Sequence, residues 1–337
     1  MTVRSDGPGG ARRPAPVRAA LILFCSGLIA ACGSRPGELE RFVVPEGATL
    51  HAVAETLSAH DIIEWSPGFR IYARVKGQDE AIKAGTYQLR QGLGWSRALE
   101  ALVAGRVATF PVTVPEGWTL IQIADRVAPL TGLRPDTVAR RLEDLGLVDS
   151  LQVPGPTLEG YLFPDTYRFA EGVAPVQVAA EMVRHYRAVW DSARRAALDS
   201  IGMDERQVVT LASIIQAEAR YDDEMPLISA VYHNRLRRGM RLQADPTVQY
   251  ALESRKKRLL YADIDSVATH PYNTYTHAGL PPGPIGSPGL AAIDAALHPA
   301  PVPYLYFVAG QNGHHEFSRT LVEHNRTIRR LRREGSR

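Results

Sequence analysis

The stretch Val44–Leu50, with the sequence VPEGATL, recurs as Val114–Leu120 with the sequence VPEGWTL. Each copy follows an apolar run typical of a strand, at Phe42–Val44 and at Phe110–Val114. In each copy Pro-Glu-Gly indicates a turn, and the threonine behind it is suited to cap a helix N-terminus. The repeat therefore predicts two strand–turn–helix units.

Both copies lead into the spacing of an amphipathic helix, in which apolar residues recur at i, i+3, i+4 and i+7. These apolar positions are Leu50, Val53, Ala54 and Leu57 in the first copy, and Leu120, Ile123, Ala124 and Val127 in the second.

The first copy opens a small module that we place at residues 40–106. Helices are predicted at Ser66–Val75 and Ser96–Ala104, with a strand at Gly85–Leu89 between them. A small module of strands flanked by helices resembles LysM, a domain that binds glycans containing N-acetylglucosamine. The alternative is a packing module without a ligand.

From Ala108 onward the pattern is mainly helical, and we place a second domain at residues 107–332. Gly/Pro-rich loops with aromatic residues are expected at Glu159–Tyr167, Tyr272–Gly289 and Tyr304–Phe317. The predicted fold class is α+β, with a cleft between the loops that suits an extended sugar chain. Helices are predicted at Pro135–Leu145, Pro175–Ile201, Glu205–Arg220 and Pro226–Arg238.

Composition is that of a globular protein of two domains: 337 residues, 45% hydrophobic, 22% charged, with a net charge of +3. Both cysteines, Cys25 and Cys32, lie near the N-terminus, so the predicted domains contain neither a disulfide nor a thiolate site. Nucleic acid is not expected as a partner, because no predicted domain combines a basic stripe with stacking aromatic residues. The arginine-rich C-terminus, from Arg326 to Arg337, is interpreted as a solvated helix end.

Residues 1–32 predict export. The uncharged run 19–31 follows Arg12, Arg13 and Arg18, and it is shorter than the roughly 20 apolar residues of a spanning helix. Its end, Ile29–Gly33 (IAACG), resembles the bacterial lipobox, in which Cys32 would carry a lipid. An uncleaved single-pass membrane anchor and plain secretion are the alternatives. Residues 33–39 then form a tether, and the remainder is expected in the cell envelope, which is the periplasm in a Gram-negative cell.

A single carboxylic acid stands out in the helix predicted around Val208–Arg220 (VVTLASIIQAEAR). Glu218 lies at the edge of the apolar stripe, between Ala217 and Ala219. A carboxyl group beside apolar surface has a raised pKa, so it can remain protonated and donate a proton near neutral pH. The alternative is an ordinary solvated glutamate on a helix edge.

An ordered series of motifs surrounds this helix, and together the motifs resemble the YceG-like family of endolytic murein transglycosylases over roughly residues 40–330. The motifs are Leu158–Tyr167, Leu211–Glu218, Val231–Leu236, Gly239–Tyr250, Tyr272–Tyr275, Gly279–Ile285, Ser287–Gly289, His298–Ala300, Tyr304–Val308 and His315–Ser318.

The resemblance implies a LysM-like module followed by a mainly helical catalytic domain that cleaves within peptidoglycan strands. It places the catalytic glutamate at Glu218. Many members carry a second glutamate where this chain has Gln216. Members usually join a membrane-spanning segment to the catalytic part, so the apparent lipobox at Cys32 departs from the family pattern. The implied partners are peptidoglycan strands and the membrane, with peptidoglycan synthases as further candidates, and no cofactor is implied.

The implied chemistry needs one acid. Glu218 would protonate the glycosidic oxygen after N-acetylmuramic acid and then take the proton from that sugar's C6 hydroxyl as it attacks C1. The products would be 1,6-anhydro ends, and the expected role is to limit the length of nascent strands. Two alternatives stay open: a hydrolase that uses water with Asp245 or Glu159 as a second carboxylate, and a noncatalytic envelope scaffold.

Further residues are predicted to contact the sugar. Gln243 and Asp245 could hydrogen-bond it or orient Glu218, although Asp245-Pro246 also matches a helix cap followed by proline. Glu159 could be a second acid or a structural hydrogen-bonding group. The loop that follows offers stacking faces and an amide, with Asn273 the first choice, or it packs its own aromatic rings. The loop residues are Tyr272, Asn273, Thr274 and Tyr275.

No metal site is expected. His298 and His315 stand apart from any second ligand at chelating spacing, and the adjacent pair His314-His315 is not a chelating pair by itself.

Overall fold

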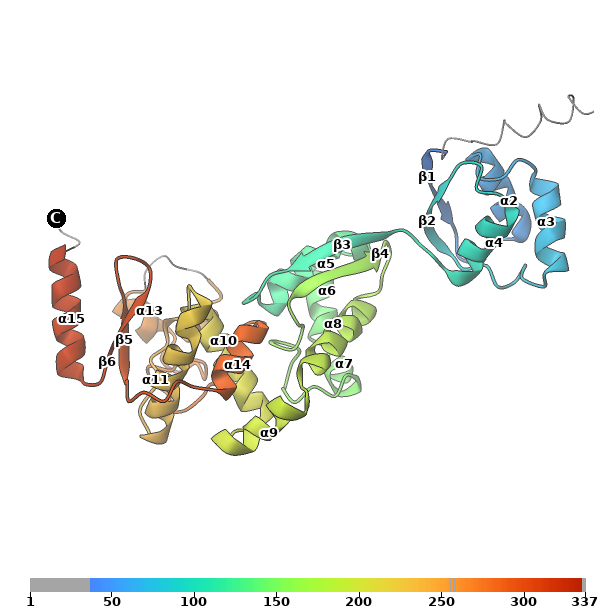
Figure 1. Cartoon of the computed structure of the whole chain (residues 1–337). Coiled ribbons are helices and arrows are strands. Elements are labelled where there is room, and N and C mark those ends of the chain that lie inside the picture. Colours follow the sequence, from blue (N-terminus) through green and yellow to red (C-terminus); the bar gives the residue numbers. More distant parts are fainter. Residues whose placement is uncertain (1–36, 255, 257–258, 335–337) are drawn as a thin grey trace, which may run out of the picture. The chain divides into compact units, whose positions relative to one another are not determined.

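The computed structural model describes residues 37–254, 256 and 259–334 (Figure 1). The chain divides into two compact units, one up to Val107 and one from Ala108 onward. The predictions for residues 1–36, including the lipid attachment at Cys32, lie outside the described residues. Among the helices that are described, none is both long enough and apolar enough to span a bilayer.

The first unit is a two-stranded sheet with three helices: β1 (Leu39–Val44), α2 (Leu50–Ala59), α3 (Ser66–Val75), β2 (Gly85–Arg90) and α4 (Trp95–Ala104). The strands pair antiparallel, with Phe42 opposite Tyr87. Thr49 caps α2, since its side chain accepts a hydrogen bond from the Ala52 amide at 3.2 Å. The strand–turn–helix prediction is therefore correct for this copy.

The second unit opens with the same order of elements: β3 (Thr109–Val114), α5 (Leu120–Thr131), α6 (Pro135–Leu142), β4 (Asp165–Ala170) and α8 (Pro175–Val189), with α7 (Leu145–Ser150) inserted. Thr119 caps α5 in a capping box with Gln122. Gly47 and Gly117 both adopt a left-handed backbone, with φ of 72° and 75°, which explains the glycine in each Pro-Glu-Gly turn.

The repeat is longer than the turn alone. Residues 85–92 (GTYQLRQG) match residues 165–172 (DTYRFAEG), and both segments form the second strand of their unit. Tyr87 and Tyr167 occupy the same place, and each donates from its hydroxyl to the carbonyl four residues earlier, at 2.7 and 2.5 Å. The prediction of a loop at Glu159–Tyr167 is thus wrong for its last three residues, which begin β4.

The rest of the second unit is a group of helices closed by a hairpin. The β5–β6 hairpin corrects the prediction of a continuous loop at Tyr304–Phe317. The elements are α9 (Ser192–Ile201), α10 (Glu205–Glu218), η1 (Asp222–Glu224), α11 (Met225–Arg237), α12 (Asp245–Ala251), α13 (Tyr261–Ser266), α14 (Leu290–Leu297), β5 (Tyr306–Ala309), β6 (His315–Ser318) and α15 (Leu321–Glu334).

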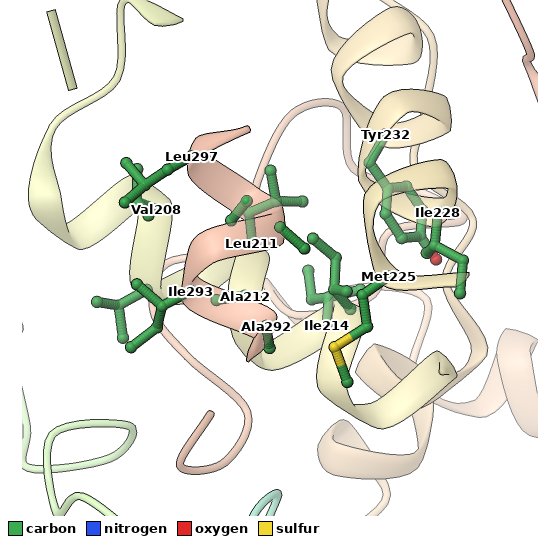
Figure 2. Packing of buried hydrophobic residues seen from close by; sticks show 14 of the residues in the cluster. Val208, Leu211, Ala212, Ile214, Met225, Ile228, Tyr232, Ala292, Ile293 and Leu297 are labelled. Carbon is green, nitrogen blue, oxygen red and sulfur yellow. The ribbon is translucent and has the colours of Figure 1, made fainter. Parts of the chain in front are cut away.

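Helix α10 lies at the centre of this group. Every residue from Val208 to Ile215 is buried. Figure 2 shows Leu211 and Ile214 of α10 beside Tyr232 and Ile228 of α11, with Ile293 of α14 on the other side. A helix whose side chains are buried on every face belongs to the core. The buried part of α10 therefore holds both ends of the helix in fixed positions.

Two predicted helices are shorter than expected because capping residues interrupt them. The helix predicted at Pro135–Leu145 ends at Leu142, since the Asp144 side chain caps α7 by accepting from the Gly146 amide at 2.7 Å. The helix predicted at Pro175–Ile201 divides at Trp190, and the Asp191 side chain caps α9. Local capping therefore overrides a continuous apolar pattern. The α+β class is confirmed.

The two caps give a paired test. Replacing Thr119 with alanine removes the side-chain acceptor at the start of α5 and should lower the free energy of unfolding by about 1 kcal/mol. Thr49→Ala should have an effect of similar size, because Thr49 holds the equivalent place in the first unit. Denaturant unfolding followed by circular dichroism measures both. An unchanged midpoint for Thr119→Ala would contradict the role of the cap.

Candidate active site

Glu218 is the last residue of α10. Ala219 has an extended backbone (φ −69°, ψ 133°), so the helix stops two residues before the predicted end at Arg220. The Glu218 side chain is partly exposed, although the helix turns before it are fully buried. The core therefore fixes the position of the carboxyl group while leaving it accessible.

The environment of Glu218 favours its protonated form. Burial raises its pKa to about 7, and the negative charge of Asp245 acts in the same direction. The hydroxyl of Tyr232, which donates to Glu218 Oε1 at 3.0 Å, and the positive charge of Arg235 act in the opposite direction. Near neutral pH a large fraction of Glu218 thus holds a proton that it can donate.

Tyr232 and Arg235 were not among the predicted site residues. Both lie in the motif Val231–Leu236 of α11, and both are buried. The Arg235 guanidinium donates to the carbonyls of Leu305 and Leu242, at 2.7 and 2.5 Å. The sequence pointed to these two residues only by including them in that motif. Their effect on Glu218 depends on how α10 and α11 pack, which the sequence does not reveal.

Asp245 lies at the start of α12, and its carboxylate accepts a hydrogen bond from the Tyr275 hydroxyl. The alternative interpretation of Asp245 as a helix cap is wrong, since Ala244 holds the cap position and α12 has no side-chain cap. Asp245 and Gln243 are exposed. The structure therefore brings together Glu218, Asp245 and Tyr275.

Asn273 and Thr274 hold the loop in place. Asn273 is fully buried; its Nδ2 donates to the carbonyls of Ile264 and Val267, and its Oδ1 accepts from the Tyr275 amide. Thr274 is also buried, and its Oγ1 accepts from the Ala244 amide at 3.0 Å. Both side chains are buried and position Tyr275 and Asp245, and their contact with sugar stays a prediction.

Glu159 is buried and has a structural role. Its carboxyl oxygens accept from the Leu120 amide at 3.0 and 3.2 Å, and from the Tyr250 hydroxyl at 3.3 Å. Tyr250 in turn packs against Tyr272, with ring centroids 4.8 Å apart. Glu159 thus joins the start of α5 to α12, in line with the alternative of a structural hydrogen-bonding group. Tyr272 packs against Tyr250, in line with the alternative of a loop that packs its aromatic rings.

The second Pro-Glu-Gly turn is joined to the loop that precedes α14. The Gly117 amide donates to the Ser287 carbonyl at 2.7 Å, and the Ser287 amide donates to the Trp118 carbonyl at 2.8 Å. Gln216 belongs to the same contact, because its Oε1 accepts from the Gly289 amide at 2.9 Å. Gln216 therefore anchors this loop to the last turn of α10.

His315 lies at the start of β6 and contacts Glu224, with 3.3 Å between Nδ1 and Oε2. The structure therefore gives this histidine a structural partner. His298 follows α14 as its C-cap and is exposed.

These features define an α+β protein with a partly protonated acid at the end of a buried helix, beside an Asp–Tyr pair. Residues 42–330 match the model of the YceG-like family, and the chain belongs to that family.

Three similar proteins support this family assignment. A protein of Bacillus subtilis (strain 168) named endolytic murein transglycosylase is 33% identical over 299 residues, covering 84% of this chain and 82% of the relative. A protein of the same name from Streptococcus pneumoniae serotype 2 is 28% identical, covering 85% of this chain but 57% of that relative. A yceG-like protein from Listeria monocytogenes, with a crystal structure at 2.6 Å, is 34% identical with a TM-score of 0.59, over 86% of this chain and 99% of the other.

Removing the Tyr232 hydroxyl should raise the pKa of Glu218 above about 7, because that hydrogen bond stabilises the ionised carboxylate. An NMR titration of the Glu218 carboxyl carbon in Tyr232→Phe measures the shift. Tyr261→Phe, at an exposed tyrosine on α13, is the control and should leave the titration unchanged. A pKa that stays put or falls in Tyr232→Phe would refute this account of the acid.

Glu159 makes stability depend on pH. Burial raises its pKa from 4.5 to about 8, so the folded state holds a proton that the unfolded state releases. The contribution is fully present below about pH 4.5 and is lost as the pH rises through about 8. Between these pH values the free energy of unfolding should fall less steeply with pH in Glu159→Gln than in wild type, by at most about 1.4 kcal/mol per pH unit. Urea unfolding at several pH values tests this, and parallel curves for both proteins would count against it.

Proposed function

We propose that the chain cleaves peptidoglycan glycan strands internally as a lytic transglycosylase, with Glu218 as the catalytic acid. The observation that carries the proposal is the position of the Glu218 carboxyl group, which a buried helix holds next to the Tyr232 hydroxyl. Burial there raises the pKa of Glu218 to about 7, as an acid catalyst requires. The name of the relatives, endolytic murein transglycosylase, supports the same substrate and the same location in the cell envelope. Attachment to the membrane through the N-terminal segment and Cys32 is part of this proposal.

The geometry of Glu218 suits an acid that later acts as a base. Tyr232 donates to Oε1, so the acid proton belongs on Oε2. Oε2 donates this proton to the glycosidic oxygen as the bond from C1 of N-acetylmuramic acid to that oxygen breaks. The resulting carboxylate takes the proton of the C6 hydroxyl while O6 forms a bond to C1. Atoms balance without water, and the product is a 1,6-anhydro end.

Asp245 and Tyr275 support this reaction from beside the acid. A carboxylate close to the sugar stabilises the positive charge that develops at C1. The hydrogen bond from Tyr275 holds the Asp245 carboxylate in one orientation. Gln243 lies two residues before Asp245, has a left-handed backbone (φ 49°) and is exposed, so its side chain can hydrogen-bond the sugar.

The position of Asp245 also favours a second candidate function. An exposed carboxylate close to an acid could activate water, which would make the enzyme a hydrolase that leaves reducing ends. The two functions use the same residues and differ in the attacking group, so the chemical nature of the new ends distinguishes them.

We also propose that residues 40–106 are a glycan-binding module of the LysM type. Trp65 is 56% exposed and pairs with Trp95, with ring centroids 6.2 Å apart. Exposed aromatic rings are suited to stack on sugars. Such a module would keep the enzyme on its strand, in keeping with a role in limiting strand length beside peptidoglycan synthases.

Replacing Glu218 with glutamine keeps the shape of the side chain but removes the acid, so strand cleavage should fall about 100-fold or more. Purified wild type, Glu218→Gln and the exposed control Glu253→Gln are incubated with peptidoglycan, and the released fragments are analysed by mass spectrometry. Anhydro ends from wild type and from the control, with little product from Glu218→Gln, are expected. Reducing ends would indicate the hydrolase, and full activity in Glu218→Gln would exclude Glu218 as the acid.

A further inference from the structure

A cavity of about 590 Å³ lies at the N-terminal end of α10. Its walls are the start of α10 with the residues before it, the last turns of α11, and the loop Gly279–Pro282. Neither Glu218 nor Asp245 lines it. The function proposed above leaves this cavity without a role.

The cavity and the acid are separate places on the same helix. Thr210 lines the cavity, and Glu218 lies eight residues further along α10, a rise of roughly 12 Å. Leu211 and Ile214, which lie between them, are completely buried against neighbouring helices. The buried core therefore separates the cavity from Glu218 along this face of α10.

Two arginines give the cavity a positive character. The Arg206 guanidinium donates to the Pro282 carbonyl, and Arg237 Nη2 donates to Asn234 Oδ1 at 2.5 Å. Within residues 37–254, 256 and 259–334, neither arginine has a carboxylate at ion-pair distance. A guanidinium has five N–H donors, so both retain donors for a ligand. Asp204 is the negative charge in the wall, and its carboxylate accepts from the Gln207 amide at 2.8 Å. The two arginines outnumber it, so the lining keeps a net positive charge.

The other walls suit a peptide better than a simple anion. His233 is 4% exposed, and its Nε2 is 2.9 Å from the Ala296 carbonyl, which makes Nε2 the donor and leaves Nδ1 as an acceptor. Met203, Leu236 and Leu280 line the cavity and also pack on the hydrophobic core. A suitable ligand would have a carboxylate for the arginines, an amide N–H for His233 Nδ1, and small apolar side chains for the apolar part of the wall.

We propose that this cavity binds the acidic peptides that peptidoglycan strands carry, so that the enzyme prefers peptide-bearing strands over bare ones. The proposal rests on the function proposed above, because it takes its ligand from the same polymer. These peptides hang from the muramic acid residues and combine free carboxylates with alanine methyl groups. Five extended residues span at most roughly 17 Å, which exceeds the rise of roughly 12 Å along α10 between Thr210 and Glu218.

The binding experiment uses the free pentapeptide from peptidoglycan and isothermal titration calorimetry. Losing a charge-assisted hydrogen bond should weaken binding about tenfold or more in Arg206→Gln and in Arg237→Gln. Arg238→Gln, at the exposed neighbour that does not line the cavity, should bind as wild type does. Two variants are used because Arg206 also holds the loop through its hydrogen bond to the Pro282 carbonyl, so its loss could disturb the loop itself. Arg237 is the last residue of α11 and makes no such contact with the loop.

A kinetic experiment then compares strands that carry peptides with strands stripped of them by an amidase. Arg237→Gln should raise KM severalfold on peptide-bearing strands, leave kcat unchanged, and leave bare strands unaffected. Failure of wild type to cut either substrate would refute the proposed function while the calorimetry still tests the cavity. The cavity proposal is overturned if the pentapeptide does not bind wild type, if both variants bind it as wild type does, or if inorganic phosphate binds there and the pentapeptide does not.

Discussion

The complete burial of α10 is the constraint on which the second unit depends. Side chains all round the helix from Val208 to Ile215 pack against α11, α14 and the surrounding loops. A helix held in this way cannot slide or rotate without opening the core, because protein interiors are close-packed. The ends of α10 are therefore fixed in space. One end carries Glu218, and the other forms a wall of the 590 Å³ cavity.

The sequence predicted those parts of the structure that depend on local signals. Thr49 and Thr119 cap their helices as expected. The repeated turn was predicted correctly for the same reason, since glycine and proline restrict the backbone locally. Glu218 was singled out by the family resemblance of the motifs around it, because the apolar stripe alone left an ordinary solvated glutamate as the alternative.

The parts that could not be predicted depend on contacts between distant residues. Strand β4 was interpreted in part as a loop, because its partner β3 lies far away in the sequence. Asn273 was expected to face a sugar, but its amide is used by carbonyls of its own loop. Tyr232 was missed, since only the packing of α11 on α10 brings its hydroxyl to Glu218. An isolated motif reveals which residue types are present but not what they face.

The repeated turn has different surroundings in its two copies. In its seven-residue turn the two copies differ only where Ala48 corresponds to Trp118. The later copy has exchanged backbone hydrogen bonds with the loop around Ser287, whereas nothing lies within 4 Å of a side chain added at Gly47 in the earlier copy. The same strand–turn–helix pattern thus occurs once in each unit. In the second unit its turn is hydrogen-bonded to the loop that Gln216 of the acid-bearing helix also contacts, so the turn helps to fix the end of α10 that carries Glu218.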